Sequence, residues 1–231
     1  MLTVVKVGGS LCKDKKILGK LCQELSTLED ILIVPGGGEF ADLVRKIDNK
    51  FSLFPELSHR MAILAMEQTG HLLLNFSDRF RALHSLDKIG NIEGIPILMP
   101  THLLLSRNDL SASWNITSDS IALYISSLVN SEKLILLKDV DGIYDRDPKK
   151  EKDARLIPEL CAKELKMIKQ SCVDKGFPEL LTKYGIEVFI INGKYPERVK
   201  NAIGGKEFRG TIIKSESYII QVSKNGKEKK R

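Results

Sequence analysis

The chain has 231 residues, of which 42% are hydrophobic, and a formal net charge of +6 at pH 7. This length and apolar content suffice for one globular domain or for two lobes of one unit. Residues 224–231 hold five basic side chains and one acid, so they carry +4 of the net charge and the rest of the chain is nearly neutral. Because no aromatic residues are interleaved with this basic run, we expect no nucleic-acid partner.

The terminal segments and the cysteine spacing indicate the cellular location of the protein. Residues 223–231 have no apolar side chain to bury, so we expect them to form a basic disordered tail. No apolar run approaches the roughly 20 residues that cross a bilayer, and no secretory leader is recognisable, so we expect no membrane partner. The cysteines at 12, 22, 161 and 172 are too irregularly spaced for a metal knuckle. These features predict a cytoplasmic protein whose own side chains bind no metal.

The first strand carries an unusual lysine. Apolar residues alternate through Val4–Val7 around Lys6, and the run then breaks at Gly8, Gly9 and Ser10. This pattern predicts a central strand that brings a cation and a flexible turn to one place. A lysine within a core strand is costly unless it meets an anion or reaches water. The alternative is an edge strand with Lys6 in solvent.

A second strand ends in glycines as well. Residues 31–34 are apolar, Gly36, Gly37 and Gly38 follow Pro35, and residues 39–45 have the pattern of a helix. Glycine turns leave backbone N–H groups bare to cradle phosphate, helped by the positive end of a following helix. One lysine and two such turns predict that two phosphorylated molecules meet at this place.

The next segments alternate in type. Residues 15–26 predict an amphipathic helix that joins the first two strands, and residues 57–74 predict a longer helix with Met61, Leu64, Ala65 and Gln68 on one face. That face is either an interface between copies of the chain or part of the monomer core. His59, near the start of the longer helix, either contacts an anionic substrate or is a solvated or capping side chain. Residues 95–98 predict a short strand that ends at a proline.

A third informative segment surrounds Asp119. Thr117 or Ser118 is suited to cap a helix whose apolar face continues to residue 129. Asp119 then lies in the first turn, where the helix dipole favours the carboxylate, so it is suited to hold a lysine. The alternative is an ordinary capping aspartate. Trp114, the one tryptophan, either forms a pocket wall or fills the core.

The segment from residue 133 onward has the features of a nucleotide-binding loop. An apolar strand ends at Lys138 and is followed by Asp139, Asp141, Tyr144 and the pair Asp147-Pro148. A ring can lie along a base, carboxylates can bind base edges and ribose, and lysines can bind phosphates. Residues 186–193 predict a further buried strand, and residues 210–214 and 218–222 predict a closing hairpin.

Taken together, these motifs resemble the amino acid kinase superfamily. The resemblance rests on five segments in order along the chain: residues 6–10, 35–40, 117–119, 139–148 and 210–211. That superfamily includes acetylglutamate, aspartate, uridylate and isopentenyl phosphate kinases. Residues 113–120 and 192–199 are most similar to the archaeal kinases of [5-(aminomethyl)furan-3-yl]methyl phosphate in methanofuran biosynthesis.

The resemblance implies a fold and a set of site residues. It implies an α/β fold, a three-layer αβα sandwich around an open, mainly parallel sheet, as one domain over residues 1–222. An acceptor lobe would span about 1–130 and a nucleotide lobe about 131–222. The catalytic residues would be Lys6 and Asp119. The residues in contact with the nucleotide would be Gly8, Gly9, Ser10, Lys138, Asp139, Asp141, Tyr144, Asp147 and Pro148. The residues in contact with the acceptor would be Gly36, Gly37, Gly38, Glu39, His59, Trp114, Thr117 and Ser118.

The implied reaction transfers the γ-phosphoryl group of ATP to a small phosphate monoester, with Mg²⁺ held mainly by the phosphates. We expect the furan phosphate as acceptor and a homo-oligomer as the working form. The alternatives are a uridylate, isopentenyl phosphate or acylphosphate-forming kinase, or a protein that only senses or stores a nucleotide or oxyanion. Acetylglutamate kinases have a second catalytic lysine in the C-terminal lobe, but residues 173–178 do not reproduce its motif, and Lys175 is a candidate for it.

Overall fold

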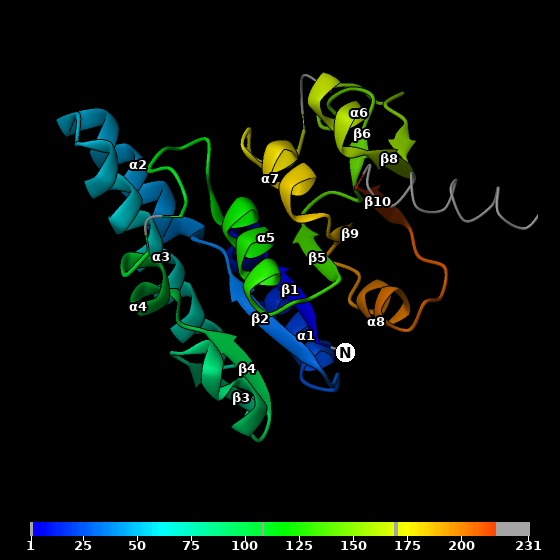
Figure 1. Ribbon diagram of the computed structural model, residues 1–231. Coiled ribbons are helices and arrows are strands. Elements are labelled where there is room, and N and C mark those ends of the chain that lie inside the picture. The colour runs from blue at the N-terminus through cyan, green and yellow to red at the C-terminus, as the bar shows by residue number, and fades with distance from the viewer. Residues whose placement is uncertain (1, 108, 169–170, 216–231) are drawn as a thin grey trace, which may run out of the picture.

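The computed structural model describes residues 2–107, 109–168 and 171–215. Most of their strands form one eight-stranded sheet (Figure 1). In sheet order its strands are β3 (Phe80–Leu83), β4 (Ile95–Leu98), β2 (Ile31–Pro35), β1 (Thr3–Val7), β5 (Lys133–Lys138), β9 (Glu187–Asn192), β10 (Gly210–Lys214) and β8 (Glu159–Cys161). Strands β6 (Ile143–Tyr144) and β7 (Leu156–Ile157) pair separately as a small antiparallel ribbon.

The first strand lies in the middle of this sheet. β1 pairs in parallel with β2 on one side and with β5 on the other, and all five of its residues are buried. The expectation of a central strand is therefore confirmed, and the edge-strand alternative is wrong. All neighbouring pairs in the sheet are parallel except β9 and β10, which agrees with the predicted mainly parallel sheet.

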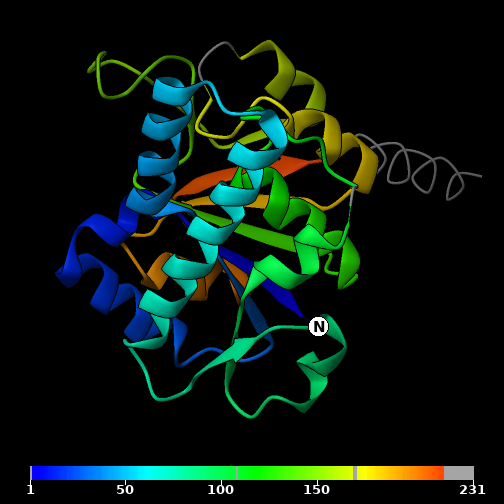
Figure 2. The ribbon, with the colours of Figure 1, turned by 90° about the vertical axis from the view of Figure 1, so that its left-hand side faces the viewer.

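Helices cover both faces of the sheet, so the predicted three-layer αβα sandwich is confirmed. Apolar residues of α4, α5, α6 and α7 pack on one face, those of α1 and α8 pack on the other, and α3 contributes Ile63 and Met66 to the first core and Leu73 to the second. Figure 1 shows the order of these elements in space. Figure 2 shows α2 and α3 side by side along one flank of the molecule. The helices are α1 (Lys15–Leu25), α2 (Gly38–Phe51), α3 (Pro55–Leu74), α4 (Pro100–Leu105), α5 (Ser118–Leu128), α6 (Ala162–Met167), α7 (Phe177–Tyr184) and α8 (Glu197–Ile203), with 3-10 turns η1 (Gly9–Lys13) and η2 (Leu86–Asn91).

The alternation of side chains along β1 decides where Lys6 points. Val5 and Val7 belong to the core on the side of α1, whereas Val4 belongs to the core on the side of α5. Successive side chains of a strand point to opposite faces, so Lys6 shares the face of Val4 and points toward α5.

Some details differ from the expectations. Strand β3 and helices α4, α6 and α7 had no expected counterpart. The predicted apolar face of the 57–74 helix is confirmed only in part: Ala65 is buried, but Leu64 is 43% exposed. Ile63, Met66 and Leu73 form the rest of the buried face. Strand β10 lies between β9 and β8 in the sheet, a position that the sequence did not predict. Its expected partner, 218–222, and the expected tail, 223–231, lie outside the described residues.

Candidate active site

The candidate site lies at the carboxyl ends of the two central strands. From β1 the chain continues through α1 to β2 on one side, while β5 lies on the other side of β1. Ligands of open α/β sheets bind at such a point, where the direction of strand order reverses. Both predicted glycine turns and the segment after β5 begin here.

Asp119 holds two lysines in this place. The Nζ of Lys6 donates to Oδ1 of Asp119 at 2.7 Å, and the Nζ of Lys138 donates to Oδ2 at 2.5 Å. The side chains of Lys6 and Asp119 are only 4% and 6% exposed. The predicted pairing of Lys6 with the carboxylate of Asp119 is therefore present, and Lys138 joins it.

The charges of these three groups depend on one another. Burial lowers the pKa of Lys6. Burial acts in the same direction on Lys138, but attraction to Asp119 outweighs it and the pKa of Lys138 is raised. Burial alone would raise the pKa of Asp119, but the ammonium groups of Lys138 and Lys6 together lower it to about 2. At neutral pH Asp119 is therefore a carboxylate that orients two lysines, and it is not suited to act as a general base.

The two glycine turns touch each other, as expected for two adjacent anion sites. A Cβ on Gly9 would lie 2.3 Å from the backbone nitrogen of Gly38, and a Cβ on Gly36 would lie 2.8 Å from the nitrogen of Gly9. Gly38 has a φ of +56°, which favours glycine. Gly8 donates its N–H to the carbonyl of Leu137 at 2.9 Å and so ties the first turn to β5.

A cavity of about 300 Å³ opens between α2, α3 and the segment before α5. Six of the predicted acceptor residues line it: Gly37, Gly38, His59, Trp114, Thr117 and Ser118. Gly9 and Ser10, predicted for the nucleotide, line it too. The other two predicted acceptor residues, Gly36 and Glu39, do not line the cavity. Gly36 packs against Gly9, and Glu39 is exposed. The sequence reasoning missed Asp42 and Arg45, which share the lining face of α2 with Gly38.

Trp114 forms part of the wall of this acceptor-side cavity. Its Nε1 donates to Oδ2 of Asp48 at 2.6 Å, and the guanidinium carbon of Arg45 lies 4.5 Å from the centroid of a Trp114 ring. These contacts fix the indole against α2, so Trp114 is a pocket wall and not a core plug.

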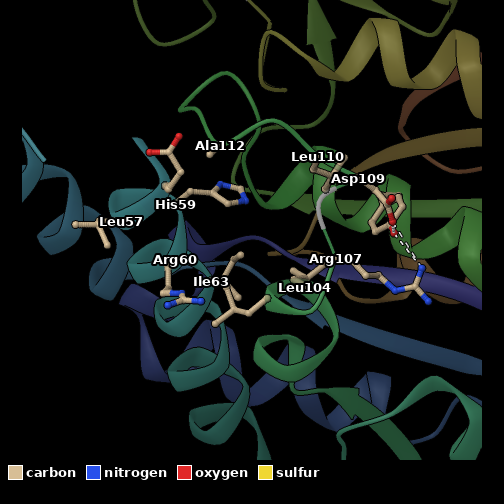
Figure 3. Close-up of a pocket in the computed structure, with 12 residues that line it drawn as sticks. Leu57, His59, Arg60, Ile63, Leu104, Arg107, Asp109, Leu110 and Ala112 are labelled. Carbon is tan, nitrogen blue, oxygen red and sulfur yellow. Dashed lines mark hydrogen bonds and ion pairs between the residues drawn. The ribbon is translucent and has the colours of Figure 1, made fainter. Parts of the chain in front are cut away.

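A second cavity, of about 310 Å³, shares His59 and Ile63 with the first (Figure 3). Its other walls include Arg107 and Asp109 from the segment after α4, whose side chains lie 3.6 Å apart. His59 therefore lies between two cavities, and burial lowers its pKa. The imidazole is thus neutral at physiological pH and able to accept or donate a hydrogen bond.

A third cavity, of about 380 Å³, follows β5. It brings together most of the residues predicted to contact the nucleotide: Ser10, Lys138, Asp139, Tyr144, Asp147 and Pro148. Ser10 lines both this nucleotide-side cavity and the acceptor-side cavity, so the two cavities meet at the first glycine turn.

Asp141 does not line the nucleotide-side cavity. Its carboxylate accepts hydrogen bonds from Asn192 at 3.0 Å, from Arg198 at 2.8 Å and from Arg209 at 2.7 Å. These contacts attach the loop after β5 to β9, to α8 and to the residue that precedes β10. The expected contact of Asp141 with the nucleotide stays a prediction, whereas its observed role is to hold the loop.

Asp174 is a residue whose role sequence reasoning did not foresee. Thr117 and Ser120 each donate to its carboxylate through their backbone N–H and their hydroxyl group. The hydroxyl of Thr117 is thus engaged by Asp174 and caps no helix itself. Asp174 thereby replaces the expected N-cap and fixes the first turn of α5, which carries Asp119.

The comparison with known proteins agrees with this geometry. The amino acid kinase family matches residues 1–83 and 91–192, which is most of the chain. The chain belongs to the amino acid kinase family. It is 38% identical over 207 residues to the [5-(aminomethyl)furan-3-yl]methyl phosphate kinase of Methanocaldococcus jannaschii, and the match covers 88% of this chain and 93% of that protein.

Solved structures of amino acid kinase relatives share the fold. The uridylate kinase from Archaeoglobus fulgidus superposes with a TM-score of 0.73 at 18% identity and covers 92% of this chain and 100% of its own. A product complex of T. acidophilum isopentenyl phosphate kinase has a TM-score of 0.63 at 21% identity and covers 93% and 100%. At these identities the structures support the fold.

In the described part of the chain, no group of three or more His, Cys, Asp or Glu side chains is placed to hold a metal ion. Over the same residues, no helix combines the length and hydrophobicity of a membrane span.

Proposed function

We propose that the chain transfers the γ-phosphoryl group of ATP to [5-(aminomethyl)furan-3-yl]methyl phosphate, giving the diphosphate, in methanofuran biosynthesis. The single observation that carries the proposal is the Lys6–Asp119–Lys138 cluster, at the place where two cavities meet beside two touching glycine turns. The 38% identity to a kinase of that acceptor supports the choice of substrate.

The acceptor-side cavity matches the three parts of this acceptor. The turn at Gly37 and Gly38, at the start of α2, offers backbone N–H groups to its phosphate. Trp114 offers an aromatic wall to the furan ring. Asp42 is the one carboxylate among the residues that line this described cavity, and it lies four residues after Gly38, about 6 Å along the helix. We assign Asp42 to the ammonium group, which a ring and two methylene groups separate from the phosphate.

The nucleotide-side cavity would hold ATP. In the proposed assignment, Tyr144 and Pro148 contact the base, Asp139 and Asp147 bind its edge or the ribose, and Gly8, Gly9 and Ser10 contact the phosphates. The proposed acceptor lobe, about 1–130, and nucleotide lobe, about 131–222, then meet along the boundary between β1 and β5.

The chemical step needs charge neutralisation more than base catalysis. An acceptor phosphate oxygen, already ionised, forms a bond to the γ-phosphorus of ATP, and the bond from that phosphorus to the β–γ bridging oxygen breaks with its electron pair left on ADP. Two unit charges 4 Å apart repel by roughly 4 kcal/mol at an effective dielectric near 20. Lys6 offsets this repulsion, while the glycine turns align the reactants.

The donor set fits a Mg²⁺ ion held mainly by phosphate oxygens. Asp119 is occupied by two ammonium groups, and the described residues contain no three-ligand group for a metal. Mg²⁺ commonly binds through substrate phosphates with few protein ligands, and it would neutralise part of the triphosphate charge.

We further propose that the protein works as a homo-oligomer. Large apolar side chains are exposed on α2, on α3 and between them: Phe40, Leu43, Phe51, Phe54, Leu57 and Leu64. Clustered exposed apolar residues mark protein contacts, so the interface alternative for the 57–74 helix is favoured for its exposed face. The cytoplasmic location stays a prediction.

One assay tests the proposed function. ADP release is measured with purified protein, ATP and Mg²⁺ against furan phosphate, UMP, isopentenyl phosphate and acetylglutamate. We expect the highest kcat/KM with the furan phosphate. Faster turnover of UMP or isopentenyl phosphate would show that this compound, and not the furan phosphate, is the substrate. ATP binding without ADP release on any acceptor would indicate a sensing or storage protein.

A further inference from the structure

We propose that Lys138 is the second catalytic cation, whose ammonium group contacts the β–γ bridging region of the bound triphosphate while Lys6 contacts the transferred group from the acceptor side. The proposal rests on the proposed function only in that ATP is the phosphoryl donor. It gives Lys138 a role in the chemical step, where the sequence had indicated nucleotide binding alone.

The sheet places both lysines on one face. In the register of the central strands Lys6 pairs with Leu136, so Lys138 lies two residues further toward the carboxyl end of β5. Leu134 and Leu136 belong to the core on the side of α5, and Lys138 has the same parity along the strand. Lys6 and Lys138 therefore project from adjacent strands toward the same helix.

Asp119, in the first turn of that helix, fixes the two ammonium groups relative to each other. Each oxygen of its carboxylate accepts from one lysine, at 2.7 Å for Lys6 and 2.5 Å for Lys138. The side chain of Lys138 is only 12% exposed. Among these three groups two positive charges meet one negative charge, while the carboxylate of Asp174 attracts both lysines from further away. Such an arrangement favours an anionic ligand.

The two lysines lie on different sides of the site. Lys138 lines the nucleotide-side cavity together with Ser10. Lys6 is nearer the acceptor turn, because a Cβ on Gly36 would lie 3.4 Å from Cε of Lys6. A phosphoryl group that passes from one cavity to the other would leave the side of Lys138 and arrive on the side of Lys6.

Other lysines near the site are less well placed. Lys175, the candidate from the sequence, is exposed; it lines a further cavity beside α7, of which Asp119 and Trp114 are also lining residues. Lys149 is 65% exposed and pairs with Asp139 at 2.8 Å. Within the described ranges, the contacts of Asp119 with lysine are those to Lys6 and Lys138.

The proposed position matches the charge that develops in the step. As the bond between the γ-phosphorus and the bridging oxygen breaks, negative charge grows on that oxygen of ADP. A preorganised donor at such a position contributes about 10² to 10³ in kcat. Lys138 donates hydrogen bonds only, so the step requires no proton transfer.

The first experiment compares Lys138→Ala and Lys138→Met with Lys175→Ala, using whichever acceptor the wild-type protein turns over fastest. Met keeps most of the volume of the side chain if the Ala variant fails to fold. We expect kcat to fall about 10²-fold or more in both Lys138 variants and to stay within about threefold of wild type in Lys175→Ala. A kcat within threefold of wild type in a folded Lys138 variant, or a large loss in Lys175→Ala, would overturn the proposal.

The second experiment is independent of the acceptor. Dissociation constants are measured for ADP and for a non-hydrolysable ATP analogue, each with Mg²⁺, in wild type and Lys138→Met. We expect the variant to lose about tenfold more affinity for the triphosphate analogue than for ADP. Equal losses for both nucleotides would place Lys138 away from the γ-phosphate and overturn the proposal, whether or not any tested acceptor is phosphorylated.

Discussion

The carboxylate of Asp174 accepts two hydrogen bonds from Thr117, one from its backbone N–H at 3.0 Å and one from its hydroxyl at 2.8 Å. The two residues are 57 positions apart in the sequence. The start of α5 is therefore fixed by a carboxylate from a distant segment, and Asp119, two residues after Thr117, is positioned with it.

Replacing Asp174 should weaken this helix start. We expect Asp174→Ala to lower the free energy of unfolding by about 2 kcal/mol, because an N-terminal cap and bonds to hydroxyl groups are lost together. Chemical denaturation measures the change, and Glu179→Ala, an exposed residue in the first turn of α7, is the control. We also expect a lower kcat, because Asp119 loses its fixed position. An unfolding midpoint equal to that of wild type would refute the cap.

Lys6 should be required for turnover but not for folding. We expect Lys6→Ala to lower kcat by about 10² to 10³, which is the usual effect of removing one preorganised donor. Steady-state ADP release measures kcat, and circular dichroism checks the fold. Lys16→Ala, an exposed change on α1, should leave kcat unchanged. Normal turnover by Lys6→Ala would remove Lys6 from the mechanism.

Asp119 should make stability depend on pH at the acid end. Its pKa is lowered from an ordinary 3.8 to about 2 by Lys138 and Lys6, although burial acts in the opposite direction. A lowered carboxyl pKa stabilises the fold above the unfolded-state value, and this stabilisation is lost as pH falls toward the folded-state value. We expect the stability difference between wild type and Asp119→Asn to be constant from pH 7 to pH 5 and to shrink by on the order of 2 kcal/mol between about pH 4 and pH 2.

The measurement is urea unfolding of both proteins across that pH range. A difference that stays flat down to pH 2 would show that the carboxylate is not stabilised by the two lysines. Asp145→Asn, a change in an exposed side chain, controls for the general effect of removing one carboxylate.

Asp42 should select for the amino group of the acceptor. We expect Asp42→Asn to raise KM for [5-(aminomethyl)furan-3-yl]methyl phosphate about tenfold, because a charged hydrogen bond is lost. KM for the analogue without the amine should change little, and kcat should change little for both. Steady-state kinetics with both compounds measures the effect. Equal increases in KM would show that Asp42 does not contact the ammonium group.

The exposed apolar residues of α2 and α3 should hold copies of the chain together. Leu43 is 57% exposed and Phe51 is 64% exposed. We expect the double change Leu43→Glu and Phe51→Glu to convert an oligomer into monomers, as measured by light scattering during size-exclusion chromatography. Matched changes of exposed Lys46 and Asn49 of the same helix to Glu should leave the oligomer intact. A wild-type protein that is monomeric at micromolar concentration would rule out the interface.

Sequence reasoning found the parts of the site that lie next to glycine turns and strand ends. Lys6 stands out because its strand is otherwise apolar, and Asp119 because it begins an apolar helix. The fold class was implied by the resemblance to a family, which five short motifs carried. These signals are local, so one chain without structure is enough to reveal them.

The contacts that sequence reasoning missed are long-range. The pairing of Lys138 with Asp119 depends on the register of β1 and β5, which no local pattern specifies. Asp174 follows a segment without clear periodicity, and Asp141 looks like a ligand-binding residue until Arg198 and Arg209 are seen to occupy it. The exposed face of α3 was misjudged because apolar residues occur on both sides of that helix.

The contact between Gly9 and Gly38 has a consequence for how the two substrates are spaced. Here peptide groups touch directly, so the gap between donor and acceptor is set by main-chain geometry and cannot be widened by a side-chain rotation. A single methyl group added at Gly9 would collide with the backbone of Gly38 and push the two glycine turns apart. Such a protein would still capture both molecules but would hold them out of reach of each other.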